Sequence, residues 1–147
     1  MDNMIQNPIF PGFNPDPCIC RKNDDFYVAV SSFEWFPGIP IYHSRDMKNW
    51  ELYSHGLTNA DEPDLKKLPS AKGIWAPCLT YCEADDLFYL VYGVMNSMNA
   101  RYFDVDNFLI TAKDPKGPWS EPVYLHSTGF DASMFHDDDG KKYVVAL

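Results

Sequence analysis

The sequence lacks any long hydrophobic run. Its longest apolar stretches are segments such as LFYLVYGVM at 87–95, well short of the roughly 18 apolar residues that a membrane-spanning helix needs. The opening residues, MDNMIQNPIF, contain no basic segment followed by an apolar one, so no secretory signal is expected. These absences argue against a membrane protein and predict a cytoplasmic one, provided that Met1 is the natural start.

Positive charge is also scarce. Lysine and arginine number 12 against 21 aspartate and glutamate residues, which gives a net charge of −9. The basic residues are scattered along the chain and form no cluster that could lie along phosphates. Nucleic acid is therefore not an expected partner, because that interaction needs a basic patch.

Cysteine and histidine are few and lack the spacing of metal ligands. The cysteines form a C-x-C pair, Cys18 and Cys20, and a C-x3-C pair, Cys78 and Cys82. We interpret them as buried or half-buried free thiols, with a metal or redox role as the lesser alternative and a structural disulfide as the least expected in a reducing compartment. The 4 histidines suggest no metal site either. Neither a metal nor an organic cofactor is expected.

Long helices are poorly supported, because 12 prolines interrupt the chain. A β pattern recurs instead. Each repeat begins with a small or acidic residue, continues through a strand of alternating residues and turns at an acidic cluster. It then returns through a strand of aromatic and β-branched residues, which indicates a β-hairpin. This pattern occurs at 16–32, 76–93 and 131–147. A second pattern, an apolar strand followed by an Asp-containing turn and a tryptophan, occurs at 41–52 and 109–122.

A hairpin followed by a strand-turn-strand segment makes four antiparallel strands, which is one blade of a β-propeller. We therefore predict an all-β fold, with a β-sandwich as the alternative. Blade one is expected at about 14–60, blade two at about 74–122 and the start of blade three at 129–147. Closed propellers have roughly 4–8 blades. The chain is thus expected to be the N-terminal part of a larger propeller.

Five segments stand out along the chain: NPIFPGFNPDPCIC, SSFEWFPGIPIYHSRDMKNW, GIWAPCLTY, VDNFLITAKDPKGPWSEPVYL and GFDASMFHDDDGKKYVV. Together, and in this order, they resemble glycoside hydrolase family 43, and within it the β-xylosidases that also accept α-L-arabinofuranosides. The resemblance implies a five-bladed β-propeller, of which this chain supplies about two and a half blades. It also implies an active site at one end of the central channel.

The resemblance further implies hydrolysis with inversion by three carboxylates. Asp16 in NPDP matches the general base, and Asp131 in GFDAS matches the residue that orients the general acid and adjusts its pKa. The acid itself, a glutamate of a later blade, has no counterpart here and is expected beyond Leu147, so the 147-residue chain alone is expected to be inactive. From the residues alone, Asp16 between two prolines could equally be a turn-former.

The repeat gives independent support for a shared pocket. Asp16 and Asp131 each begin a hairpin, and the corresponding residue of blade two is Ala76, preceded by Trp75. By resemblance, Phe33, Trp75 and Phe130 match the aromatic wall around the sugar in the −1 subsite. Each of the three could instead belong to the core.

The predicted function is that of an exo-acting β-1,4-xylosidase that releases pentoses from xylo-oligosaccharides by direct attack of water. An accompanying α-L-arabinofuranosidase activity on arabinosides and a homo-oligomeric state are left open. The alternative is a non-catalytic carbohydrate-binding or assembly fragment that needs a complementing chain. A glutamate in the remaining blades would distinguish the two.

Overall fold

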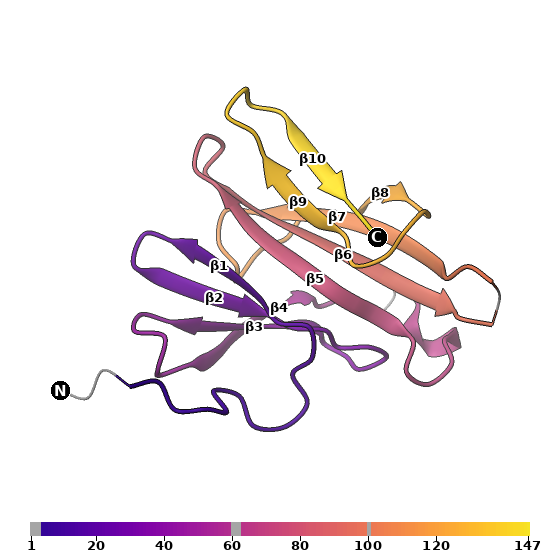
Figure 1. Ribbon diagram of the computed structural model, residues 1–147, viewed down its shortest axis with the longest axis horizontal. Coiled ribbons are helices and arrows are strands. Elements are labelled where there is room, and N and C mark those ends of the chain that lie inside the picture. The colour runs from indigo at the N-terminus through magenta and orange to yellow at the C-terminus, as the bar shows by residue number, and fades with distance from the viewer. Residues whose placement is uncertain (1–3, 60–62, 100) are drawn as a thin grey trace.

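The computed structural model describes residues 4–59, 63–99 and 101–147. Within these residues the chain forms two four-stranded antiparallel sheets and a separate hairpin (Figure 1). The first sheet contains β1 (Cys18–Lys22), β2 (Asp25–Ala29), β3 (Gly38–Ser44) and β4 (Glu51–Leu57). The second sheet contains β5 (Gly73–Cys82), β6 (Leu87–Ser97), β7 (Asp104–Ala112) and β8 (Val123–His126). The hairpin is formed by β9 (Ser133–His136) and β10 (Lys142–Val145).

Among the described residues helix is limited to a single short 3-10 turn, η1 (Leu65–Lys67), in the connection between the two sheets. No helix among the described residues is long and apolar enough to cross a bilayer. The prediction of an all-β fold is therefore confirmed.

Each sheet is a meander in which every strand is hydrogen-bonded to the next one in the chain. This is the strand order of a propeller blade, so the chain supplies two blades and the first hairpin of a third. Strand β8 begins at Val123, just past the expected limit of blade two. The reason is local, because Pro118 and Pro122 lack the amide hydrogen that a strand ladder needs. The expected end of blade one, near residue 60, lies outside the described residues.

The first strands of the three units lie next to one another. Strand β1 contacts β5, and β5 in turn contacts β9 (Figure 1). Strands β1 and β9 begin two residues after Asp16 and Asp131, whereas Ala76 lies near the start of β5. The fold therefore brings the starts of three hairpins, which are far apart in sequence, to one region.

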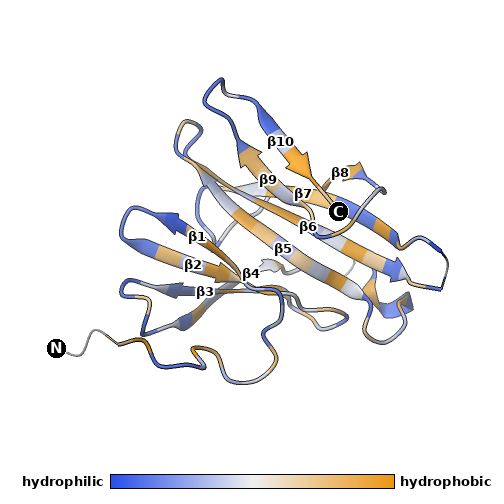
Figure 2. Cartoon of the chain, viewed as in Figure 1, coloured by the Kyte–Doolittle hydropathy of each residue, from blue (hydrophilic) through white to orange (hydrophobic). Residues whose placement is uncertain are grey.

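The main core fills the space between the two sheets. Figure 2 shows hydrophilic hairpin tips and hydrophobic residues within the strands. The fully buried side chains of the core include Ile39 and Ile41 from β3, Leu79 from β5 and Leu90 from β6. Burial of each such side chain stabilises the fold by about 1.5–3 kcal/mol. Apolar packing thus fixes the first blade against the second.

Polar contacts between blades add to this packing at the hairpin ends. Lys22 Nζ lies 2.8 Å from Asp86 Oδ1, which joins the first hairpin to the second. Thr80 Oγ1 lies 2.8 Å from His136 Nε2, and Lys142 Nζ lies 2.7 Å from Asp85 Oδ2. Each pair connects neighbouring hairpins, so these contacts fix the relative position of the inner strands toward the hairpin tips.

Candidate active site

Asp16, Ala76 and Asp131 share an uncommon backbone conformation. Their φ angles are 52°, 37° and 52°, in the left-handed region that residues other than glycine rarely adopt. In β5 the ladder with β6 is interrupted between Trp75 and Cys78, on either side of Ala76. The same local conformation therefore recurs near the start of three inner strands and gives three blades a common way to present a side chain at this end.

A buried serine connects two of these positions. The hydroxyl of Ser31 donates a hydrogen bond to Asp16 Oδ2 at 2.7 Å and accepts one from the Ala76 backbone N–H, also at 2.7 Å. Ser31 is 2% exposed, and its own N–H donates to the Pro15 carbonyl at 3.0 Å. Ser31 therefore holds the Asp16 carboxylate in a fixed direction and ties blade one to blade two at this point.

The two aspartates interact electrostatically. Partial burial raises the pKa of the Asp131 carboxyl, and the negative charge of Asp16 raises it further. Both side chains remain accessible at the end of the inner strands. The sequence prediction that these two carboxylates face one region agrees with this interaction, although their chemical roles stay predictions. Among the described residues, no group of three or more His, Cys, Asp or Glu side chains could hold a metal ion.

Aromatic rings extend in a series beside the carboxylates. The ring centroids of Phe33 and Trp75 lie 5.7 Å apart, and those of Trp75 and Phe103 lie 6.4 Å apart. Phe103 in turn lies 4.9 Å from Phe130, the residue before Asp131. The structure thus brings together the three aromatic residues that the sequence suggests as a sugar-binding wall, with Phe103 between two of them.

The backbone holds this series in place. Phe33 and Ile74 exchange two hydrogen bonds, from Phe33 N to Ile74 O at 2.9 Å and from Ile74 N to Phe33 O at 3.0 Å. Gly73 has a φ of +103°, and a Cβ there would collide with the Phe33 carbonyl. This close approach of two blades sets Phe33 and Trp75 side by side.

Two residues of this region were missed by sequence reasoning. Ser31 lies in the SSF segment after β2, and nothing in that segment marks its hydroxyl as a partner of Asp16. Phe103 follows Tyr102 in the β6–β7 connection, where a pair of aromatics in a loop is the only signal. Both are recognisable only when residues that are far apart in the sequence are seen together.

The thiols of Cys18 in β1 and Cys78 in β5 are also in contact between the first two blades. Each cysteine lies two residues after Asp16 or Ala76. The hydrogen bond between them raises the pKa of Cys18 and lowers that of Cys78. A backbone hydrogen bond from Met134 further lowers the pKa of Cys78. All four cysteines are free thiols, which confirms that sequence interpretation.

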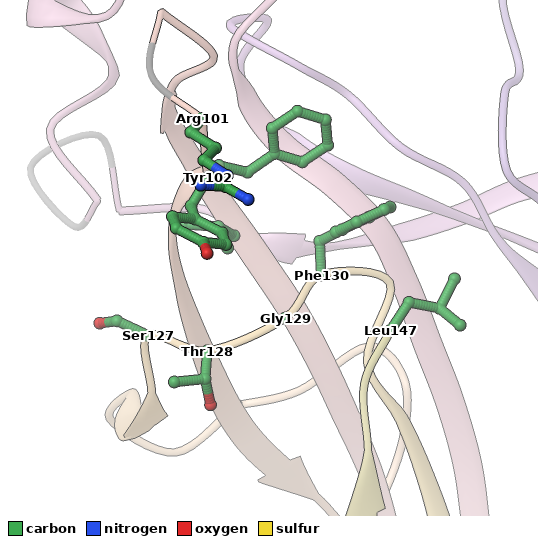
Figure 3. A pocket seen from close by; sticks show the side chains of 9 residues that line it. Arg101, Tyr102, Ser127, Thr128, Gly129, Phe130 and Leu147 are labelled. Carbon is green, nitrogen blue, oxygen red and sulfur yellow. The ribbon is translucent and has the colours of Figure 1, made fainter.

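A hollow of about 460 Å³ opens next to the aromatic series. Arg101 and Tyr102 line one side of it, with Phe130 and Leu147 on the other (Figure 3). Its volume is in the range of small-molecule pockets. Neither carboxylate lines it, so the pair of aspartates marks the candidate site better than the hollow does.

Comparison with known proteins gives consistent matches. The chain is 50% identical over 143 residues to the protein named β-xylosidase from Bacillus subtilis (strain 168). It is 48% identical over 143 residues to xylosidase/arabinosidase 43B from Humicola insolens. Each match covers 97% of this chain and 26% of the relative. The chain therefore spans about a quarter of the length of these relatives.

A solved structure agrees in fold. The chain superimposes on the crystal structure of xylan β-1,4-xylosidase from Bacillus halodurans C-125 with a TM-score of 0.91 and 51% identity, covering 96% of this chain and 27% of that one. The family model for glycosyl hydrolases family 43 matches residues 5–146. The β-propeller prediction is confirmed by these neighbours, and the chain belongs to glycosyl hydrolase family 43.

Proposed function

We propose that this chain is part of an exo-acting, inverting β-1,4-xylosidase, with α-L-arabinofuranosidase activity as a secondary reaction. The observation that carries the proposal is the pair Asp16 and Asp131, which begin equivalent strands and interact electrostatically. The names of the relatives, β-xylosidase and xylosidase/arabinosidase, support the substrate class.

Asp16 is the proposed general base. A base must accept a proton from water while that water attacks the anomeric carbon, so its carboxylate must be held in one direction. The hydrogen bond from Ser31 supplies this orientation. An inverting enzyme also needs an acid about 6.5–9.5 Å from the base, on the opposite face of the sugar. We propose that a glutamate outside this chain fills that role.

Asp131 is proposed to act through that acid. A carboxylate beside another carboxyl group raises the pKa of the latter, because like charges disfavour ionisation. A general acid must remain protonated near neutral pH. Asp131 would supply this effect in the complete site, just as the charge of Asp16 now raises the pKa of Asp131 itself.

The remaining residues suit a pentose. Phe33, Trp75 and Phe130 offer half-buried aromatic surface to the apolar faces of a sugar ring. Ala76 stands where the other two blades place an aspartate. We propose that this small side chain leaves room for the sugar between the carboxylates.

The test is the hydrolysis of xylobiose by the full-length protein and its Asp16→Asn variant. Loss of the base should lower kcat by about 10²–10⁴-fold while KM stays within a few-fold. Asp138→Asn is the matched control, because Asp138 is an exposed aspartate in the β9–β10 turn, and it should leave kcat unchanged. Near-normal turnover by Asp16→Asn would remove Asp16 as the base.

The alternative is a carbohydrate-binding or assembly fragment. It is favoured if the wild-type protein binds xylobiose by calorimetry but does not hydrolyse it. Cytoplasmic location and self-association stay predictions.

A further inference from the structure

The series of aromatic rings continues past Phe33, away from the carboxylates. The ring of Phe13 lies 5.5 Å from that of Phe33, and the ring of Trp35 lies 5.2 Å from that of Phe13. Phe13 is 54% exposed and Trp35 is 62% exposed, whereas Phe33 is half-buried. Exposure therefore increases along the series, as it would from the inside of a pocket to its rim.

The backbone that carries Trp35 is held from both sides. Trp35 N donates to the Ser32 carbonyl at 2.9 Å. The neighbouring Glu34 carboxylate accepts hydrogen bonds from Ala71 N at 3.2 Å and from Ser70 Oγ at 3.1 Å. A large exposed ring on a fixed backbone loses little conformational entropy when a ligand covers it.

The topology places both rings at the proposed entrance. Strand β2 runs antiparallel to β1, so the residues after β2 return to the end where β1 begins, next to Asp16. The hydrogen bond between Ser31 and Asp16 is direct evidence of this return. Phe13 precedes Asp16 by three residues in the same end region.

We propose that Phe13 and Trp35 form a stacking platform for the second sugar residue of the substrate, on the leaving-group side of the scissile bond. This inference rests on the proposed function. A sugar ring presents apolar C–H faces that pack on aromatic surface and needs no charged partner. The only carboxylate in this loop, Glu34, is already bonded to the residues before β5.

A sugar is favoured over a protein partner because the platform is continuous with the proposed −1 wall through Phe33. A substrate longer than one residue that is held in that wall must leave it past the rim. The platform therefore adds affinity for the second residue and none for a single pentose.

The experiment compares xylobiose, which reaches both subsites, with D-xylose, which fills only the first. In the full-length enzyme, Phe13→Ala and Trp35→Ala should each raise KM for xylobiose about tenfold, equivalent to about 1.4 kcal/mol, with kcat nearly unchanged. The inhibition constant of D-xylose should stay constant. Trp35→Phe should retain most of the affinity for xylobiose.

Phe36→Ala is the matched control, because Phe36 is 45% exposed on the same loop but lies outside the ring series. An unchanged KM for xylobiose in both alanine variants would overturn the platform. A parallel rise in the D-xylose constant would also overturn it, since the rings would then merely support Phe33. A lower melting temperature with unchanged kinetics would overturn it as well, because it would show that another part of the protein covers the rings.

Failure of the proposed function can be distinguished from failure of the platform. If the wild-type enzyme does not hydrolyse xylobiose, that result overturns the proposed function alone. Calorimetric titration of xylobiose into the wild-type and Trp35→Ala proteins then tests the platform. Equal affinities would overturn the platform, and a roughly tenfold weaker affinity of the variant would support it.

Discussion

Ser31 and Asp16 are joined by a 2.7 Å hydrogen bond that links the end of one strand to the start of its neighbour. The serine is buried and its hydroxyl also accepts a hydrogen bond from Ala76. The residue proposed as the general base is thus oriented by its own blade, while the same hydroxyl holds the adjacent blade.

Ser31→Ala should therefore affect both turnover and stability. The Asp16 carboxylate loses its fixed direction, and the N–H of the half-buried Ala76 loses its acceptor at a cost of about 1–3 kcal/mol. We expect kcat on xylobiose to fall about tenfold or more, at the lower end of the effects of mispositioned catalytic groups, with a modest change in KM. Steady-state kinetics and thermal unfolding of the full-length enzyme provide the measurements.

Ser32→Ala is the control for this prediction. Ser32 is equally buried, but its hydroxyl accepts from Ile39 N and has no contact with Asp16. The Ser32→Ala variant should lose a similar amount of free energy of unfolding and keep the kcat of the wild type. Equal kinetic losses in both variants would contradict a specific role of Ser31 in orienting Asp16.

The raised pKa of Asp131 predicts a pH-dependent cost to stability. A carboxyl whose pKa is higher in the folded than in the unfolded state binds more protons when the protein is folded. Its stabilising contribution to the free energy of unfolding is therefore fully present below the pKa of the unfolded state, 3.8. That contribution is lost as pH rises through the pKa of the folded state. Asp131→Asn should therefore raise the melting temperature at pH 7 by about 1–2 °C, because solvent screening limits the effect.

The difference in melting temperature between the wild type and Asp131→Asn should narrow as pH falls from 7 to 4, which scanning calorimetry can measure. The variant should also lose most of its activity, if Asp131 acts on the general acid. A melting temperature at pH 7 below that of the wild type would refute the electrostatic explanation.

Gly73 is predicted to be essential for the contact between the first two blades. Gly73→Ala places a Cβ against the Phe33 carbonyl and forces a residue with a φ of +103° into a conformation that alanine avoids. We expect a loss of at least about 2 kcal/mol in the free energy of unfolding, measured by denaturant titration, together with weaker xylobiose binding as Phe33 and Trp75 separate.

Gly140→Ala offers the comparison. Gly140 also has a positive φ, of +82°, but no atom lies within 4 Å of an added Cβ. Only the backbone preference is lost there, which costs about 1–2 kcal/mol. Similar losses at both positions would indicate that the contact between Gly73 and Phe33 contributes little.

The fold could be read from the sequence to a large extent, because its determinants are local. Alternating apolar residues, acidic turns and prolines specify hairpins wherever they occur, and their recurrence identifies blades. The last strand of blade two was less evident from the sequence, because Pro118 and Pro122 lack the amide hydrogens that a strand ladder needs. The family resemblance supplied the candidate roles of Asp16 and Asp131, which the repeat alone could only place at equivalent positions.

The class of fold, the repeat and the equivalence of Asp16, Ala76 and Asp131 thus follow from the order of residues in the chain. Three contacts become visible only in the folded protein: Ser31 holds Asp16, Phe103 stands between Trp75 and Phe130, and Phe13 and Trp35 extend the aromatic series. A strand pattern depends on neighbours in the chain, whereas these contacts join residues of separate segments. Their partners are selected by tertiary packing, within a blade and between blades, which no local pattern of residues encodes.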